Sequence, residues 1–169
     1  VSLSEDGTIV AIGAYANDDN GNDSGHTRIY QYANDSWTQL GSDIDGEAAS
    51  DLSGWSVSLS EDGTIVAIGA RYNNSGNGGH SGHTRIYQYA SGSNSWSQLG
   101  SDIDGEAAVD NSGISVSLSD DGTIVAIGAY LNFDDNGSRS GHTRIYQYAS
   151  ASTTSTLLGS ATADSNGDF

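Results

Sequence analysis

The sequence predicts an all-β fold made of three copies of one module, each with four strands. Two observations support this prediction. The decapeptide SGHTRIYQYA occurs at residues 24–33, 81–90 and 140–149, and the segments around it repeat in the same register. Between these repeats, short apolar runs alternate with turn signals, and no segment combines helical periodicity with helix caps.

Each strand can be justified from the first module. Residues 1–4 alternate apolar and polar side chains, as expected of a half-buried strand. The Asp6-Gly7 pair predicts a tight hairpin into residues 8–14, which are apolar on both faces and should be buried on both. After a loop rich in Asn, Asp and Gly, residues 27–32 and 37–41 predict the third and fourth strands.

The repeat accounts for the whole chain and leaves nothing for a second domain. We expect blades at residues 1–56, 57–115 and 116–169, the third being degenerate at its C-terminal end. The repeated arginines lie 57 and 59 residues apart, which is the size of a four-stranded β-propeller blade. The predicted fold is therefore β-propeller-like, with three four-stranded antiparallel blades that are open or completed by other chains.

Charge and composition exclude several classes of protein. The chain has 22 acidic and 5 basic residues, giving a net charge of −17, so nucleic acids and anionic membranes would be repelled. Small cations remain plausible partners. No apolar run approaches the ~20 residues of a membrane-spanning helix, and we expect no membrane insertion. The absence of cysteine excludes disulfides and thiolate metal sites.

Three motifs carry a resemblance to a known repeat. They are Ser53-Gly54-Trp55-Ser56-Val57, Ile68-Gly69-Ala70 and the segment 81–89. Together they resemble the FG-GAP repeat of the integrin α-subunit propeller and of many bacterial and algal surface proteins. The resemblance implies a cell-surface location and an adhesive or ligand-binding role. The chain departs from that pattern by lacking both the closing Pro and the DxDxDG calcium loop.

A repeated acidic stretch is the candidate metal site. Hard cations such as Ca²⁺ prefer several carboxylate oxygens from a short loop. The alternative is a solvated turn whose acids form structural ion pairs with Arg28, Arg85 and Arg144. Because each module has only one equivalent histidine (His26, His83 or His142), we do not expect these to share a metal. The acidic candidates are Asp43, Asp45, Glu47, Asp102, Asp104 and Glu106.

Four sequons are candidate sites of N-linked glycosylation. They lie at Asn22, Asn34, Asn73 and Asn136, all in expected surface loops, as glycosylation requires. The candidate cofactors are thus Ca²⁺ and N-linked glycans. Trp37 and Trp96 could stack on sugars, although cross-strand packing is the alternative role for such aromatic residues.

The function that the sequence predicts is structural. Every constellation is repeated, whereas catalysis usually depends on a unique one, so we expect no enzyme activity and no catalytic residue. Open terminal blades must bury their apolar faces against a partner. We expect an extracellular, glycosylated repeat protein that assembles by blade stacking, as a fibre subunit, with copies of itself or further repeats as partners. The alternative is an adhesion module that binds Ca²⁺, a glycan or another cell-surface ligand.

Overall fold

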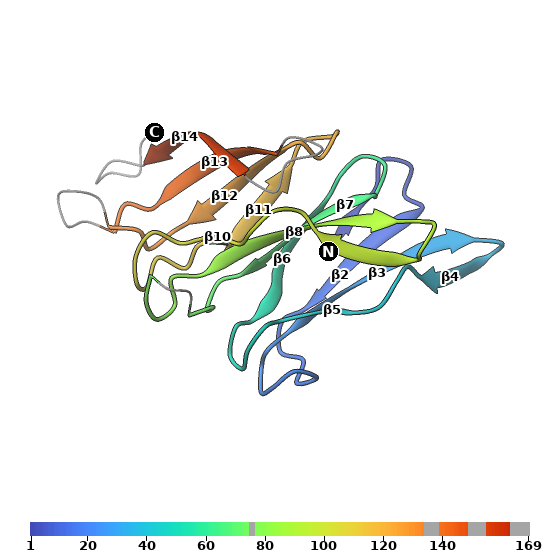
Figure 1. Ribbon diagram of the computed structural model, residues 1–169, viewed down its shortest axis with the longest axis horizontal. Helices are drawn as coiled ribbons and strands as arrows, with labels where there is room; N and C mark the ends of the chain where they lie inside the picture. Colours follow the sequence, from blue (N-terminus) through green and yellow to red (C-terminus); the bar gives the residue numbers. More distant parts are fainter. Residues whose placement is uncertain (75–76, 134–138, 149–154, 163–169) are drawn as a thin grey trace.

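The computed structural model describes residues 1–74, 77–133, 139–148 and 155–162 of the chain. Three antiparallel sheets lie side by side in chain order, from the N-terminal sheet to the C-terminal one (Figure 1). The predicted all-β, propeller-like fold is confirmed. None of the described elements is a helix, so none could cross a membrane as one.

Each sheet follows the same order of strands. A module means one such sheet with its loops, so that the second module begins at Asp51 and the third at Asp110, a few residues before the predicted blade bounds. The first contains β1 (Ser2–Leu3), β2 (Ile9–Ala14), β3 (His26–Ala33), β4 (Ser36–Gln39) and β5 (Ile44–Asp45). The second contains β6 (Ser53–Leu59), β7 (Ile65–Ala70), β8 (His83–Ala90), β9 (Ser95–Gln98) and β10 (Ile103–Asp104). The third contains β11 (Ser115–Leu118), β12 (Ile124–Ala129), β13 (His142–Tyr148) and β14 (Ser155–Thr162).

The strand that pairs with the outer edge of the third strand, which is the fourth position in each sheet, was predicted only in part. In the first two sheets it is shared by two strands, since β4 and β5 both pair with β3, and β9 and β10 both pair with β8. The predicted strand at residues 37–41 corresponds to β4, which ends at Gln39. The two-residue strands β5 and β10 were not predicted. In the third sheet, β14 fills the whole position as one strand with an irregularity in its register.

The Asp-Gly hairpin forms as predicted, and its aspartate has a specific role. Asp6 accepts hydrogen bonds from the Ser4 hydroxyl at 2.8 Å and from the Thr8 backbone N–H at 2.9 Å. Gly7 follows with a φ of 69°, a conformation that glycine adopts without steric cost. These hydrogen bonds lower the pKa of Asp6. The same turn recurs around Asp62 and Asp121 in the other modules.

The apolar core lies between the sheets. One cluster joins the first two modules around Ile9, Ile29 and Ile68, and another joins the second and third around Ile86 and Ile127. Strand β7, which has a neighbouring sheet on each side, is buried on both faces as predicted. In β2 the side chain of Ile12 is 39% exposed, because that face of the first module has no neighbouring sheet.

Glycines allow the modules to approach closely. A Cβ added to Gly13 would overlap the carbonyl oxygen of Gly54, and one added to Gly69 would overlap that of Gly113. Parallel bridges Gly25↔Ser53 and Gly82↔Ser112 tie each module to the next. The SGxS and IGA motifs therefore contain the residues that let one sheet contact its neighbour.

Candidate functional site

The unpredicted strands β5 and β10 bring histidines and carboxylates together. In the register of β3 and β5, His26 lies opposite Asp45, and in that of β8 and β10, His83 lies opposite Asp104. Side chains of directly opposed residues project to the same side of a sheet. The acidic stretch of each of these modules consequently lies against the SGHTR segment of the same module.

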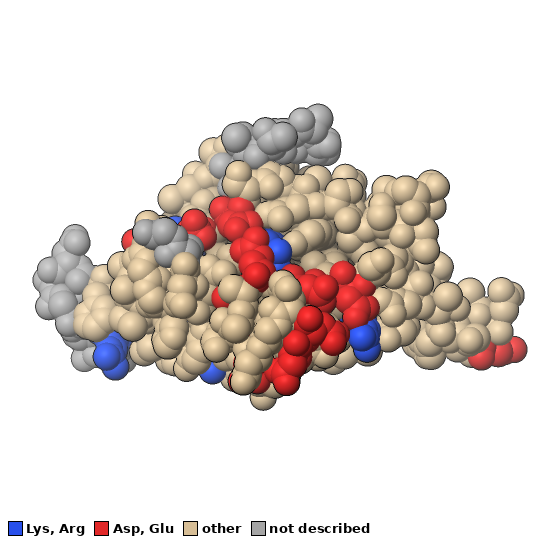
Figure 2. All heavy atoms as spheres, turned by 60° about the horizontal axis from the view of Figure 1, so that its bottom comes forward, with Lys and Arg blue, Asp and Glu red and all other residues tan. Residues whose placement is uncertain are grey.

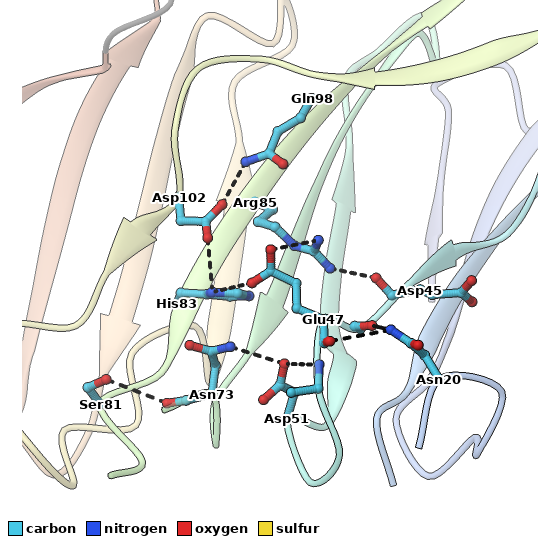
Figure 3. A network of polar contacts seen from close by, with 12 residues as sticks. Asn20, Asp45, Glu47, Asp51, Asn73, Ser81, His83, Arg85, Gln98 and Asp102 are labelled. Atoms are coloured by element: carbon cyan, nitrogen blue, oxygen red, sulfur yellow. Dashed lines mark hydrogen bonds and ion pairs between the residues drawn. The ribbon is translucent and has the colours of Figure 1, made fainter. Parts of the chain in front are cut away.

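The junction between the first two modules holds a cluster of four ionisable residues, which we call the junction cluster: Glu47, His83, Arg85 and Asp102 (Figure 3). Glu47 comes from the first module and the other three from the second. The His83 Nδ1 atom lies 3.6 Å from Asp102 Oδ2 and 3.8 Å from Glu47 Oε2. Arg85 Nη1 lies 3.6 Å from Glu47 Oε1, and its Nη2 donates to the Asp45 carbonyl at 2.7 Å.

The nitrogen-containing side chains of the junction cluster are buried, and its carboxylates are partly exposed. The side chains of His83 and Arg85 are 1% and 7% exposed, whereas those of Glu47 and Asp102 are 45% and 31% exposed. Burial, helped by the Arg85 charge, lowers the pKa of His83 to about 4, so its imidazole is neutral at pH 7. Partial burial raises the pKa of Glu47. The cluster thus presents two carboxylates to solvent over a neutral imidazole and a fixed guanidinium.

A cavity of about 280 Å³ lies at the same junction. Its lining includes Trp96, Tyr87, Asp43 and Asp45, and none of the four residues of the junction cluster. Tyr87 connects the cavity to the junction cluster, because its ring centre lies 5.6 Å from the Arg85 guanidinium carbon. Figure 2 shows acidic side chains gathered on one face of the molecule, with a few basic side chains among them.

The six predicted metal ligands do not form two equivalent sites. Asp43 and Asp45 lie with Asp19 and His26 in the first module, whereas Glu47 lies with His83 and Asp102. The acidic stretch therefore spans two sites, because its third acid extends into the next module. Among the described residues, no group of three potential ligands includes Asp104 or Glu106.

Asp43 is occupied by an arginine of its own module. Arg28 donates to Asp43 Oδ2 from Nε at 2.8 Å and from Nη2 at 2.7 Å. This hydrogen bonding lowers the pKa of Asp43. The same oxygen lies 3.6 Å from His26 Nδ1, so the arginine already uses the acceptor that a metal at this group would need.

The third module repeats only part of the junction cluster. His142 Nδ1 and Arg144 Nη1 each lie 3.6 Å from a carboxylate oxygen of Glu106, and Arg144 Nη2 donates to the Asp104 carbonyl. No acidic residue occurs in β14, which pairs with the strand of His142. Within the described residues, the junction cluster with a second carboxylate therefore occurs once.

The predicted glycosylation sites have different environments. Asn22 and Asn34 are exposed, as expected of surface loops. Asn73 is only 8% exposed and its Nδ2 donates to Asp51 at 3.0 Å. A glycan would be attached through that nitrogen, so Asn73 is not the exposed residue that was expected, and its glycosylation stays a prediction. Asn136 lies outside the described residues.

Sequence reasoning missed His83, Asp19 and His26 as parts of these groups. The signal for the two histidines was present in the repeated SGHTR segment, which places one histidine at the start of the third strand of each module, whereas Asp19 lies in the loop before that segment. Spacing along the chain did not show which acids would face them. That pairing depends on β5 and β10, whose two residues are too few to show a strand pattern.

The comparison with known proteins supports the fold and no family. No protein-family model and no curated protein matches the chain. Among solved structures, a Bacteroides uniformis protein assigned as a 6-phosphogluconolactonase is 14% identical with a TM-score of 0.60, over 94% of this chain and 39% of that one. Saccharomyces cerevisiae Sqt1 is 14% identical with a TM-score of 0.57, over 95% and 34%. A Bacteroides fragilis protein, also assigned as a 6-phosphogluconolactonase, is 13% identical with a TM-score of 0.57, over 95% and 37%.

These findings correct the sequence-based assignment. The FG-GAP resemblance is wrong, because no family model matches and the similar structures are lactonase-type proteins and Sqt1. Its motifs contain the glycines and serines that let sheets pack closely. The predicted function as an extracellular fibre subunit or adhesion module is wrong as well, because the similar structures give it no support. Two of the three similar structures are assigned as lactonases, but at 13–14% identity they show the fold alone, and they lend no support to our expectation of no enzyme activity. The chain spans less than two-fifths of the length of each protein.

Proposed function

We propose that this chain carries the reactive site of a propeller hydrolase that opens small neutral lactones. The observation that supports this proposal is the junction cluster, where carboxylates exposed to solvent meet a buried guanidinium beside a cavity. Ester hydrolysis needs a base for the attacking water and a positive group for the oxyanion. Glu47 and Arg85 offer these two groups 3.6 Å apart.

The reaction can be written with these groups. Water attacks the lactone carbonyl carbon, and the Glu47 carboxylate takes the water proton. Arg85 stabilises the oxyanion that forms. The ring C–O bond then breaks, and the leaving alkoxide takes up the proton, giving an open-chain hydroxy acid. The raised pKa of Glu47 makes its carboxylate a stronger base than an ordinary glutamate, which favours this role.

The cavity and the charge narrow the substrate class. A volume of about 280 Å³ is slightly below the ~300 Å³ at which typical ligand cavities begin, which favours a small substrate. Trp96 and Tyr87 can stack on a ring, while the exposed side chain of Asp45 can accept hydrogen bonds from hydroxyl groups. A net charge of −17 disfavours a phosphorylated substrate. A single-ring, hydroxylated, uncharged lactone fits these properties best.

The test is hydrolysis of δ-gluconolactone and of its 6-phosphate by the purified chain. We expect a rate above the uncatalysed one for the neutral lactone, and a smaller effect for the phosphate. Glu47→Gln should lower kcat/KM by about 100-fold, the lower range for a general base. Glu106→Gln is the matched control, because Glu106 holds the equivalent place at the next junction, where the second carboxylate is missing. No hydrolysis of either lactone, or equal effects of the two variants, would overturn the proposal.

A further inference from the structure

Three potential ligand atoms converge in the junction cluster without a hydrogen bond between them. They are His83 Nδ1, Glu47 Oε2 and Asp102 Oδ2, with Nδ1 lying 3.8 and 3.6 Å from the two oxygens. Asp102 uses its other oxygen to accept a hydrogen bond from Gln98 Nε2 at 2.7 Å. Arg85 is nearest to Oε1 of Glu47, the oxygen that does not face the imidazole. The neighbouring groups thus leave these three atoms facing one another.

The imidazole of His83 gives an independent sign of a missing ligand. Its side chain is 1% exposed, and neither Nδ1 nor Nε2 has a hydrogen-bond partner. A buried polar atom without a partner is uncommon and costs free energy. Because Nδ1 is directed toward two carboxylates, a cation between them would satisfy all three groups.

We propose that Glu47, His83 and Asp102 bind one divalent transition-metal ion. Two ligands at about 2.1 Å from an ion, separated by angles of about 110–130°, lie about 3.4–3.8 Å from each other. The observed separations from Nδ1 are 3.6 and 3.8 Å, and ligand atoms of all three residues lie within 4.8 Å of one another. The half-exposed side chain of Glu47 gives the ion access from solvent.

The ligand set selects the kind of metal. Calcium takes six to eight oxygen ligands and has little affinity for imidazole nitrogen. One imidazole with two carboxylates suits zinc or manganese, and three protein ligands leave a position open for water. A role for the ion in catalysis rests on the proposed function, since the ion would then replace Glu47 as the group that activates water. Binding itself rests on the geometry alone.

The equivalent histidines predict a stoichiometry of one. Among the described residues, Glu106 is the one carboxylate within 4 Å of His142, because β14 has no acidic residue. At His26, Asp19 Oδ2 lies 3.4 Å from Nδ1 and Asp45 belongs to the same group, but the Oδ2 atom of Asp43 already accepts two hydrogen bonds from Arg28, whose positive charge opposes a cation there. If a histidine beside an acid were sufficient, three ions would bind per chain. If binding requires a histidine and two free carboxylates, only the site at His83 should bind an ion.

The experiment is titration of the chelator-treated chain with Zn²⁺ and, separately, Mn²⁺ by calorimetry, without lactone. We expect one ion per chain, and at least about tenfold weaker binding in Asp102→Asn, comparable to losing a supporting ligand. His142→Gln and Glu106→Gln are the controls and should bind as the unmodified chain does. Asp102 is partly exposed, so Asp102→Asn should fold even if His83→Gln does not.

The outcomes separate the two proposals. No binding, three equivalent sites, or unchanged affinity in Asp102→Asn would overturn the metal site. Hydrolysis that continues after chelation would exclude a catalytic role for the ion while leaving the hydrolase proposal intact. Binding of one ion without any lactone hydrolysis would overturn the proposed function and support the metal site.

Discussion

The same arginine has different roles in successive modules. Arg28 binds Asp43 of its own module and is 41% exposed. Arg85 and Arg144 extend to the preceding module, where each donates to a backbone carbonyl and is 7% exposed. The contribution of each arginine to stability therefore depends on its contacts with the neighbouring module, and not on the residue type alone.

This difference predicts unequal effects of one substitution. Arg144→Ala removes a buried charged hydrogen bond and should lower the free energy of unfolding by about 1.5–3 kcal/mol. Arg28→Ala removes a half-exposed ion pair and should cost less than about 1 kcal/mol. Urea unfolding of both variants at one pH gives the comparison. Equal losses would show that Arg144 does not stabilise the junction.

The pair Arg28–Asp43 also predicts a dependence on pH. Hydrogen bonding to Arg28 lowers the pKa of Asp43 below its ordinary value of 3.8 in the folded chain. The resulting stability is present at pH values above the unfolded pKa and is lost as the pH falls through the lowered one. Asp43→Asn should therefore destabilise the chain at pH 7, by an amount on the order of 1 kcal/mol.

The measurement is urea unfolding of the unmodified chain and of Asp43→Asn between pH 7 and pH 3. The difference between them should be constant down to about pH 5 and should shrink only below that, where the unfolded carboxylate begins to be protonated. A difference that shrank already between pH 7 and pH 5 would point to a histidine rather than to Asp43.

At the scale of strands, equivalent glycines differ in what lies beside them. A Cβ on Gly69 of β7 would overlap backbone of the next module, at Gly113. On Gly128 of β12, it would approach only the hydroxyl of Ser115, a side chain of the same module that can rotate away. Three copies of IGA thus carry the same sequence in two different environments.

Alanine substitution should reveal this difference. Gly69→Ala should lower the free energy of unfolding by about 1–3 kcal/mol, because backbone atoms cannot move aside without separating two sheets. Gly128→Ala should change it by less than about 1 kcal/mol, since a glycine in a strand is itself unfavourable. Thermal unfolding of both variants measures the contrast. A similar loss in both would mean that contact between modules does not explain these glycines.

How much the sequence could predict depended on the length of each element. The hairpin at Asp6-Gly7 and strands such as β2 were predictable, because several residues share one pattern or one turn signal. Strands β5 and β10 were not, because two residues have no periodicity. The junction cluster was missed for this reason, and also because Glu47 extends into a neighbouring module that sequence spacing cannot place.

At the scale of the molecule, the two outer faces are unlike. The first module exposes an apolar face that includes Val10, Ile12, Tyr30 and Trp37. Here the sequence predicted burial of the second strand on both faces, and this holds only for β7. The third module exposes the face that the first two modules use to contact their successors, and a cavity of about 230 Å³ there is lined by Gly128, Ser140 and Gly141.

The contacts between the first and second modules, and between the second and third, indicate what would pack on the exposed face of the third module. The backbone N–H of Ser53 donates to the Ser24 carbonyl at 2.9 Å, and that of Ser112 donates to the Ser81 carbonyl at 2.9 Å. Each donor belongs to an Asp-x-Ser-Gly stretch at the start of the next module. Ser140 holds the equivalent acceptor position in the third module. We therefore predict that this face accepts a further module of the same repeat.

This prediction can be tested by replacing residues 163–169 with a copy of residues 46–104. The added module should pack on the third, which raises the midpoint of thermal unfolding and keeps a single transition, because burying another apolar face stabilises both modules. Gly128→Ala is the decisive variant. It should be tolerated in the original chain and should destabilise the extended one by about 1–3 kcal/mol, as Gly69→Ala does in the original. If Gly128→Ala has the same small effect in both chains, the added module does not use this face, and the glycine-lined cavity has another occupant.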